Sequence, residues 1–213
     1  MGVNMKKSIL VMVFCCVAIF LFGCNTQNTI NIEETKSNTI FIKNDGTIQA
    51  ATVETFDKDY YSSEELEAFI TENMNDYNEA NNKTANNEKQ SESNPAISLE
   101  SLKVDKGYAV LVLNYASIED YNAFNEKSMV FTTLSDVNGK EITLPDVYVS
   151  ASDGAYVAPE VVLKNEKYKV IIVNDQTDLI IDGKIKYFTN GKLINKSRFE
   201  AGGEKESVII YKP

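Results

Sequence analysis

The sequence predicts an α+β domain built mainly from an antiparallel β-sheet, and three observations lead to this fold class. Short apolar runs rich in Val, Ile and Tyr recur along the second half of the chain, bounded by Gly, Asn and Asp. Only two segments have apolar residues at helical spacing. Most neighbouring runs are joined by sequences too short for a helical crossover, so we expect hairpins and antiparallel pairing.

The first folded element is expected to be a hairpin in TIFIKNDGTIQAATVETF, residues 39–56. Two strand-like runs flank Asn44, Asp45 and Gly46, and an Asp-Gly pair between apolar runs is a strong hairpin signal. Before it, residues 24–38 contain too little apolar surface to offset the entropy of ordering. We therefore expect residues 24–38 to be a flexible tether.

The next element is predicted to be an amphipathic helix over about residues 63–80, packed on the sheet. Ser62 and Glu65 have the spacing of a capping box. Residues 78–95 then have no apolar side chain larger than alanine and predict a polar flexible loop, although a linker between two domains fits the same composition. The apolar residues at helical spacing are Leu66, Phe69, Ile70, Met74 and Tyr77.

From residue 97 onward the chain is expected to be mostly strand, with one short helix over about residues 118–126. DKG, residues 105–107, predicts a turn between two strands, and Asn138 with Gly139, and Asn190 with Gly191, are further hairpin signals. Residues 39–213 are predicted to form a single domain, because a hairpin and one helix alone bury too little surface. The expected strands are ISLESLKV, YAVLVLNYAS, MVFTTLSD, ITLPDVYVS, YKVIIVND, LIIDGKIKYFT and ESVIIYK.

The charge of the chain restricts its partners. The formal net charge is −10, and if Lys6 and Lys7 leave with a signal peptide, 19 basic and 31 acidic residues remain, a net charge of −12. Such a surface repels nucleic-acid phosphates, so we expect no nucleic-acid partner. It also disfavours electrostatic adhesion to anionic lipids, so something other than a basic patch would have to attach the protein to a membrane.

The N-terminus has the layout of a secretory signal peptide. Lys6 and Lys7 precede an apolar run of 14 residues, 9–22, and a small residue, Gly23, follows it. As a helix this run would extend about 21 Å, less than the ~30 Å of a bilayer core, so cleavage is favoured over permanent spanning. Residues 1–23 are therefore the predicted signal peptide, and an uncleaved signal anchor is the alternative.

The end of this run resembles the lipobox of bacterial lipoprotein precursors: Leu21, Phe22 and Gly23 stand at the recognition positions and Cys24 at the invariant cysteine. The resemblance implies that a diacylglyceryl group is attached to the Cys24 sulfur and that the chain is cut just before Cys24. Two acyl chains of palmitate length hold a protein stably on a membrane. The resemblance to lipoprotein precursors also implies that the protein is anchored on the outer, extracellular face of the cell membrane.

The body of the chain is similar to small uncharacterised lipoproteins of low-GC Gram-positive bacteria. The segments that carry this similarity are GYAVLVLNYASIEDYNAFN and VIIYK, together with the acidic composition. The resemblance implies the same location and no particular activity.

The residue types present exclude several kinds of chemistry. There is no His, and the three Cys are Cys15, Cys16 and Cys24, so His-based triads and the usual zinc, copper and haem ligand sets are absent from the sequence. We predict no catalytic residue, no metal site and no cofactor. Carboxylates in FDKDYYSSEE and IEDY could attract calcium, but neither segment has an EF-hand loop, and acidic residues are favoured at a helix N-terminus in any case.

The leading functional hypothesis is a non-enzymatic surface module that binds a protein or cell-envelope partner. Aromatic side chains are enriched at interfaces, and we single out Tyr60, Tyr61 and Tyr121 as a candidate partner surface. A solute-binding lipoprotein of a transporter is one alternative, which would need a cleft between two lobes. A surface hydrolase that uses two carboxylates is another, which would need two acids in a groove, one with a raised pKa.

Overall fold

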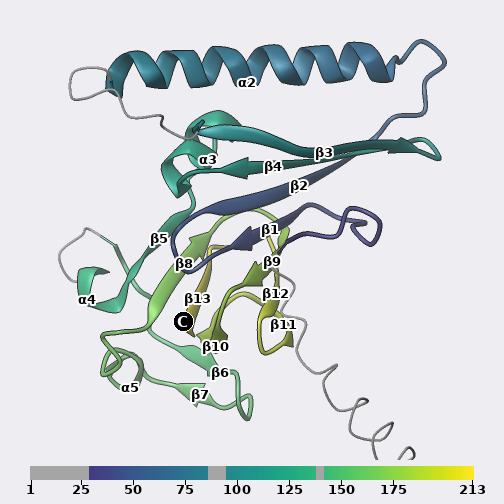
Figure 1. The fold of residues 1–213 in the computed structure, drawn as a ribbon. Coiled ribbons are helices and arrows are strands. Elements are labelled where there is room, and N and C mark those ends of the chain that lie inside the picture. The colour runs from purple at the N-terminus through teal and green to yellow at the C-terminus, as the bar shows by residue number, and fades with distance from the viewer. Residues whose placement is uncertain (1–28, 86–94, 138–141) are drawn as a thin grey trace, which may run out of the picture.

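The computed structural model describes residues 29–85, 95–137 and 142–213, and in them two β-sheets pack against each other (Figure 1). Sheet A has seven strands in the order β11-β12-β9-β1-β2-β4-β3, and sheet B has six in the order β5-β8-β13-β10-β6-β7. The α+β class with mainly antiparallel pairing is confirmed. Sheet A consists of β1 (Thr39–Ile42), β2 (Ile48–Thr55), β3 (Ile97–Asp105), β4 (Tyr108–Tyr115), β9 (Thr177–Ile181), β11 (Gly191–Asn195) and β12 (Arg198–Ala201). Sheet B consists of β5 (Val130–Thr133), β6 (Tyr148–Ser150), β7 (Tyr156–Val157), β8 (Lys169–Val173), β10 (Lys184–Phe188) and β13 (Ser207–Lys212).

Two of the predicted hairpins form where their turn residues stand. Gly46, between β1 and β2, has φ +91°, and Asp45 accepts the Thr47 N–H at 2.9 Å. Between β3 and β4, Lys106 and Gly107 both have positive φ angles, 51° and 81°, the signature of a two-residue type I′ turn. Unlike the other pairs, β1 and β9 are parallel, and this pair joins the N-terminal and C-terminal parts of sheet A.

Helix α2 (Ser63–Ala85) lies along β3 (Figure 1). Its buried side chains in the core are Ile70 and Met74. The Ser62 hydroxyl accepts the Glu65 N–H at 3.2 Å, as the capping signal predicts. The predicted helix is present, and it extends five residues beyond its predicted end near residue 80. Asn78 exchanges two hydrogen bonds with the backbone of Ile97, at 2.8 and 2.9 Å, and this contact holds the polar part of the helix against β3. The rest of the predicted loop, residues 86–94, lies outside the described residues.

The short helix is confirmed as α3 (Ile118–Asn125), with Ser117 as its N-cap accepting the Asp120 N–H at 3.0 Å. Two further one-turn helices, α4 (Leu134–Val137) and α5 (Pro159–Val162), were not predicted. They belong to the segment that covers the outer face of sheet B, where Leu134, Val137 and Val162 pack on the buried strands β8 and β13. No helix in the described ranges is long and apolar enough to cross a membrane.

The hairpin predicted at Asn190 and Gly191 does not form. These residues join β10 of sheet B to β11 of sheet A, and β11 turns back into β12 at residues 195–198 instead. Asn190 has φ 46°, and a Cβ on Gly191 would lie 2.3 Å from the Phe199 ring. The turn signal is therefore real, but it marks a corner between the sheets. The signal at Asn138 and Gly139 lies outside the described residues.

Part of the segment predicted to be a flexible tether, residues 24–38, packs on sheet A. Ile30 is only 8% exposed and packs on Phe41, Ala51 and Val112 of the outer face of sheet A. Its N–H donates to the side-chain oxygen of Gln49, which is itself fully buried. This segment therefore covers part of the sheet, while residues 24–28 lie outside the described residues.

Candidate functional site

A groove lies on the outer face of sheet A at the end where β3 turns into β4. We call it the hairpin groove, and it has a volume of about 470 Å³. The strand register explains its floor, because Val110 of β4 lies opposite both Val53 of β2 and Lys103 of β3 and all three side chains share one face. The N-terminal segment forms its wall. The lining residues are Ile32, Glu33, Thr35, Lys36, Val53, Lys103, Asp105, Lys106, Tyr108 and Val110.

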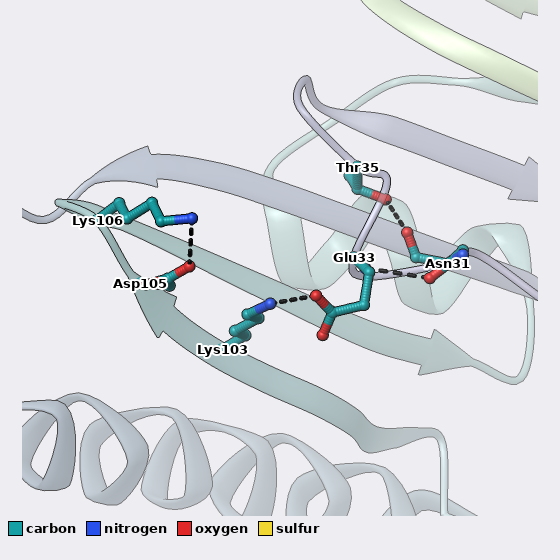
Figure 2. Close-up of polar contacts among 6 residues, drawn as sticks. All are labelled: Asn31, Glu33, Thr35, Lys103, Asp105 and Lys106. Carbon is teal, nitrogen blue, oxygen red and sulfur yellow. Dashed lines mark hydrogen bonds and ion pairs between the residues drawn. The ribbon is translucent and has the colours of Figure 1, made fainter.

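Polar contacts fix the wall of the hairpin groove to the sheet (Figure 2). The Asn31 side chain accepts the Glu33 N–H at 3.1 Å, and the Thr35 hydroxyl donates to the Asn31 carbonyl at 2.7 Å. These bonds close a turn that presents the Glu33 carboxylate to the Lys103 ammonium, with which it forms an ion pair. The hydrogen bond to Glu33 raises the pKa of Lys103. The turn therefore keeps a segment that is polar in sequence in a defined position.

The hairpin groove has little net charge. Lys103 is paired with Glu33, and Lys106 lies 3.6 Å from the Asp105 carboxylate, so only Lys36 among the lining cations has no ion-pair partner within the described residues. Exposed pairs of this kind contribute little binding or folding energy. The apolar floor, rather than electrostatic attraction, is what this groove offers to a ligand or partner.

An exposed aromatic cluster lies at the same end of sheet A. Tyr60 is 77% exposed and Tyr61 43% exposed, and their ring centroids are 5.0 Å apart. Phe56 stacks on Tyr61 with a centroid distance of 4.8 Å, and its backbone N–H donates to the Gly107 carbonyl at 2.7 Å. We call Phe56, Tyr60 and Tyr61 the tyrosine cluster. Because the bond to Gly107 ties it to the β3–β4 turn, the cluster lies next to Tyr108 of the hairpin groove.

Tyr121, the third predicted surface tyrosine, does not belong to this surface. It is 7% exposed and packs edge-on against Tyr115 with a centroid distance of 5.3 Å. Burial raises its pKa. Tyr121 lies with Ile118 on the buried face of α3, so it is not available as a partner surface.

The acidic candidates do not come together. No group of three or more Asp, Glu, Cys or His side chains that could hold a metal ion occurs in the described ranges. Glu64 accepts hydroxyl hydrogens from Ser62 and Ser63 at 2.9 and 3.3 Å, and its own backbone N–H, followed by these hydroxyls, lowers its pKa. Its position in the first turn of α2 accounts for these contacts.

The carboxylate pair of a hydrolase is likewise not found in the described part of the chain. The carboxyl groups with a shifted pKa there are Asp45, Glu64 and Asp153, and all three pKa values are lowered by hydrogen bonds. None of the fully buried residues described is an Asp or Glu. The carboxylate hydrolase stays a hypothesis without a site among these residues.

Sequence reasoning missed the hairpin groove, although one signal was available. The strand YAVLVLNY is apolar at nearly every position, which indicates a strand covered on both faces rather than on one. Val112 is buried under Ile30, whereas Val110 lies in the groove beyond the segment that provides this cover. The sequence of β4 could have predicted that something covers the outer face of this strand. It could not have predicted which segment of the chain does so.

Comparison with known proteins adds no assignment. No protein-family model matches the chain, and no match was found among the curated proteins or the solved structures. The functional proposal therefore depends on the residues described above.

Proposed function

We propose that this protein is a lipoprotein, anchored through Cys24 on the outer face of the cell membrane, that binds a protein or cell-envelope partner without catalysing a reaction. The observation that carries the binding part is the exposed tyrosine cluster fixed beside the apolar floor of the hairpin groove. Neutral aromatic and apolar surface of this kind is typical of interface cores.

The geometry of this surface favours binding in two ways. Tyr60, Tyr61 and Tyr108 present large side chains with few rotatable bonds, so they can bury area at a low entropic cost. The hydrogen bond from Phe56 to Gly107 and the turn at Asn31 hold both parts of the surface before a partner arrives. Such preorganisation reduces the ordering cost of association.

The anchor is supported by the sequence, in which Leu21, Phe22, Gly23 and Cys24 follow a signal-like run. A diacyl group on Cys24 would hold the protein on the membrane despite its acidic charge. The solute-binding alternative receives less support, because the hairpin groove lies on one face of one sheet, whereas the cleft of such proteins lies between two lobes.

Metabolic labelling with a palmitate analogue tests the anchor. The wild type and Cys16→Ala should both be labelled, and Cys24→Ala should not, since only the Cys24 sulfur is the proposed attachment atom. Cys16→Ala is the matched control because it removes a thiol from the same signal region. Equal labelling of Cys24→Ala and the wild type would refute the anchor.

Site-specific photocrosslinking in the native cells tests the binding surface. A photoreactive phenylalanine derivative at Tyr60 should capture a defined partner, identified by mass spectrometry, and the capture should be lost when Tyr61→Ala is added. The control is the same derivative at Tyr156, which is 82% exposed and lies on β7 of sheet B. The same set of captured proteins at both positions would count against a specific partner surface.

A further inference from the structure

One segment of the chain has the opposite charge to the rest. The stretch GKIKYFTNGKLINKSRF, residues 183–199, contains no Asp or Glu, whereas the whole chain has a net charge of −10. Its five cations are Lys184, Lys186, Lys192, Lys196 and Arg198. A local concentration of positive charge on an otherwise acidic chain attracts anions, so the segment is a candidate for anion recognition.

The fold brings three of these lysines into one groove at the border of the two sheets. Lys184 and Lys186 come from β10 of sheet B, and Lys196 comes from the turn between β11 and β12 of sheet A. We call it the lysine groove; it has a volume of about 590 Å³, and none of its lining residues is acidic. Tyr187 and Ile194 also line it, so it combines positive charge with apolar surface.

The walls of the lysine groove are held by backbone hydrogen bonds between elements. The Ile185 N–H donates to the Lys196 carbonyl at 2.8 Å, and the Ile181 N–H donates to the Ser197 carbonyl at 2.8 Å. On the other side, the Ala151 N–H donates to the Lys186 carbonyl at 2.9 Å. These bonds therefore fix the backbone of Lys196, in the β11–β12 turn, relative to the backbones of Lys184 and Lys186 on β10.

The three ammonium groups have no carboxylate partner in the described residues. The ion pairs found there involve Lys58, Lys103, Lys106 and Lys127. Ser150 and Ser152 also line the groove, and Asp153 beside them already accepts the Ala155 N–H at 3.2 Å and a hydrogen bond from Ser150. Like charges gathered in one groove repel, and a bound anion would remove that repulsion.

From this geometry we infer that the lysine groove binds the phosphate group of a small phosphate monoester. Lysine recognises phosphate as a compact point charge, and a monoester carries about −1.5 to −2 at neutral pH, more than a carboxylate or a phosphodiester. The acidic remainder of the surface opposes anions, but this opposition is screened beyond about 10 Å. The groove should therefore select anions with high local charge, and Tyr187 and Ile194 would contact the organic part.

Isothermal titration of the full chain in neutral detergent, at constant ionic strength, tests this inference with glycerol 3-phosphate as the probe. The triple variant Lys184→Gln, Lys186→Gln, Lys196→Gln should bind at least tenfold more weakly than the wild type. The control is Lys58→Gln, Lys164→Gln, Lys205→Gln, which removes the same charge from exposed positions outside both grooves and should bind within twofold of the wild type. No binding by the wild type at millimolar concentration, or equal weakening in both triple variants, would overturn the inference.

Two further arms separate the sources of phosphate and guard against misfolding. Glycerophosphoglycerol, the soluble headgroup of a phospholipid, carries a single charge and should bind more weakly than the monoester. Binding of this diester alone would overturn the monoester assignment and indicate a lipid headgroup. The single variant Lys196→Glu, at an exposed turn position, should also abolish binding while leaving the thermal midpoint within a few degrees of the wild type, and unchanged affinity in it would contradict the inference.

Discussion

The buried tyrosines show how single residues set the stability of this protein. The Tyr148 and Tyr211 hydroxyls are fully enclosed and have no hydrogen-bond partner in the described structure. The Tyr115 hydroxyl, by contrast, accepts the Asn125 side-chain N–H at 3.0 Å. A buried polar atom without a partner gives up its hydrogen bonds to water and gains none in the protein, which costs free energy. Loss of the hydroxyl should therefore affect stability differently at Tyr115 than at Tyr148 and Tyr211.

We predict that Tyr148→Phe and Tyr211→Phe leave the free energy of unfolding unchanged or raise it. Tyr115→Phe should lower it by about 0.5–1.5 kcal/mol, because it removes a hydrogen bond and leaves the rest of the side chain in place. Urea unfolding followed by circular dichroism measures all three. A loss at Tyr211 as large as that at Tyr115 would mean that the Tyr211 hydroxyl has a partner.

Alkaline pH should destabilise the fold through the same side chains. Burial raises the pKa of Tyr148 to about 12, and the unfolded value is near 10. The neutral form is favoured in the folded state, so this stability is fully present below pH 10 and is lost as pH rises from about 10 to 12. Between those values the unfolding free energy of Tyr148→Phe should fall less steeply than that of the wild type, by at most about 1.4 kcal/mol per pH unit. Parallel slopes would contradict the prediction.

Gly191 should tolerate no side chain. A Cβ there would lie 2.3 Å from Phe199 and 2.5 Å from the Glu200 carbonyl oxygen, and neither atom can move without disturbing β12. We expect Gly191→Ala to lower the free energy of unfolding by about 1–3 kcal/mol. Gly202→Ala is the matched control, since its nearest neighbour, the Asn190 carbonyl oxygen, is 3.8 Å away. Thermal unfolding of the two variants should differ by several degrees, and equal midpoints would contradict the close packing.

At the scale of elements, α2 uses only part of its apolar face. Ile70 and Met74 are buried, whereas Phe69, next to Ile70 in the same apolar pattern, is 64% exposed. We predict that Ile70→Ala lowers the free energy of unfolding by about 2–4 kcal/mol and that Phe69→Ala changes it by less than about 0.5 kcal/mol. Urea unfolding measures both, and a large loss at Phe69 would show that α2 packs more deeply than described.

The elements also show why some features could be predicted and others could not. The turns at Gly46 and Gly107 depend on the backbone angles of the residues themselves, so the sequence is sufficient to find them. The C-terminal half of α2 depends on the contact between Asn78 and Ile97, which no local pattern contains. Ile30 could not be placed either, because its pocket is made by three strands that meet only in the folded sheet.

The candidate surfaces divide in the same way. Tyr60 and Tyr61 were singled out because aromatic side chains are enriched at interfaces, and both side chains are exposed in the structure. The lysine groove combines residues of two sheets, and only its charge pattern is visible in the sequence. The strand order could not be predicted, because the sequence does not show that β10 joins sheet B while β11 joins sheet A.

For the whole molecule, one core connects the two sheets. Ile42 of sheet A and Ile209 of sheet B are both fully buried in the same apolar cluster. We predict that Ile42→Ala and Ile209→Ala each lower the free energy of unfolding by about 2–4 kcal/mol and that each variant still unfolds in a single transition. Tyrosine fluorescence and far-UV circular dichroism should give the same midpoint. Separate transitions for the two probes would mean that the sheets unfold independently.

The docking of Ile30 on sheet A limits how far the body can stand from the proposed anchor at Cys24. Once Cys24 carries the proposed acyl chains, six residue steps separate the anchor from Ile30, and a fully extended chain covers at most about 20 Å over that length. This reach is close to the radius of gyration of about 16 Å expected for a body of this size. With the proposed anchor in place, the body would therefore stay in a thin layer just above the headgroups, and a binding partner would have to come within that layer.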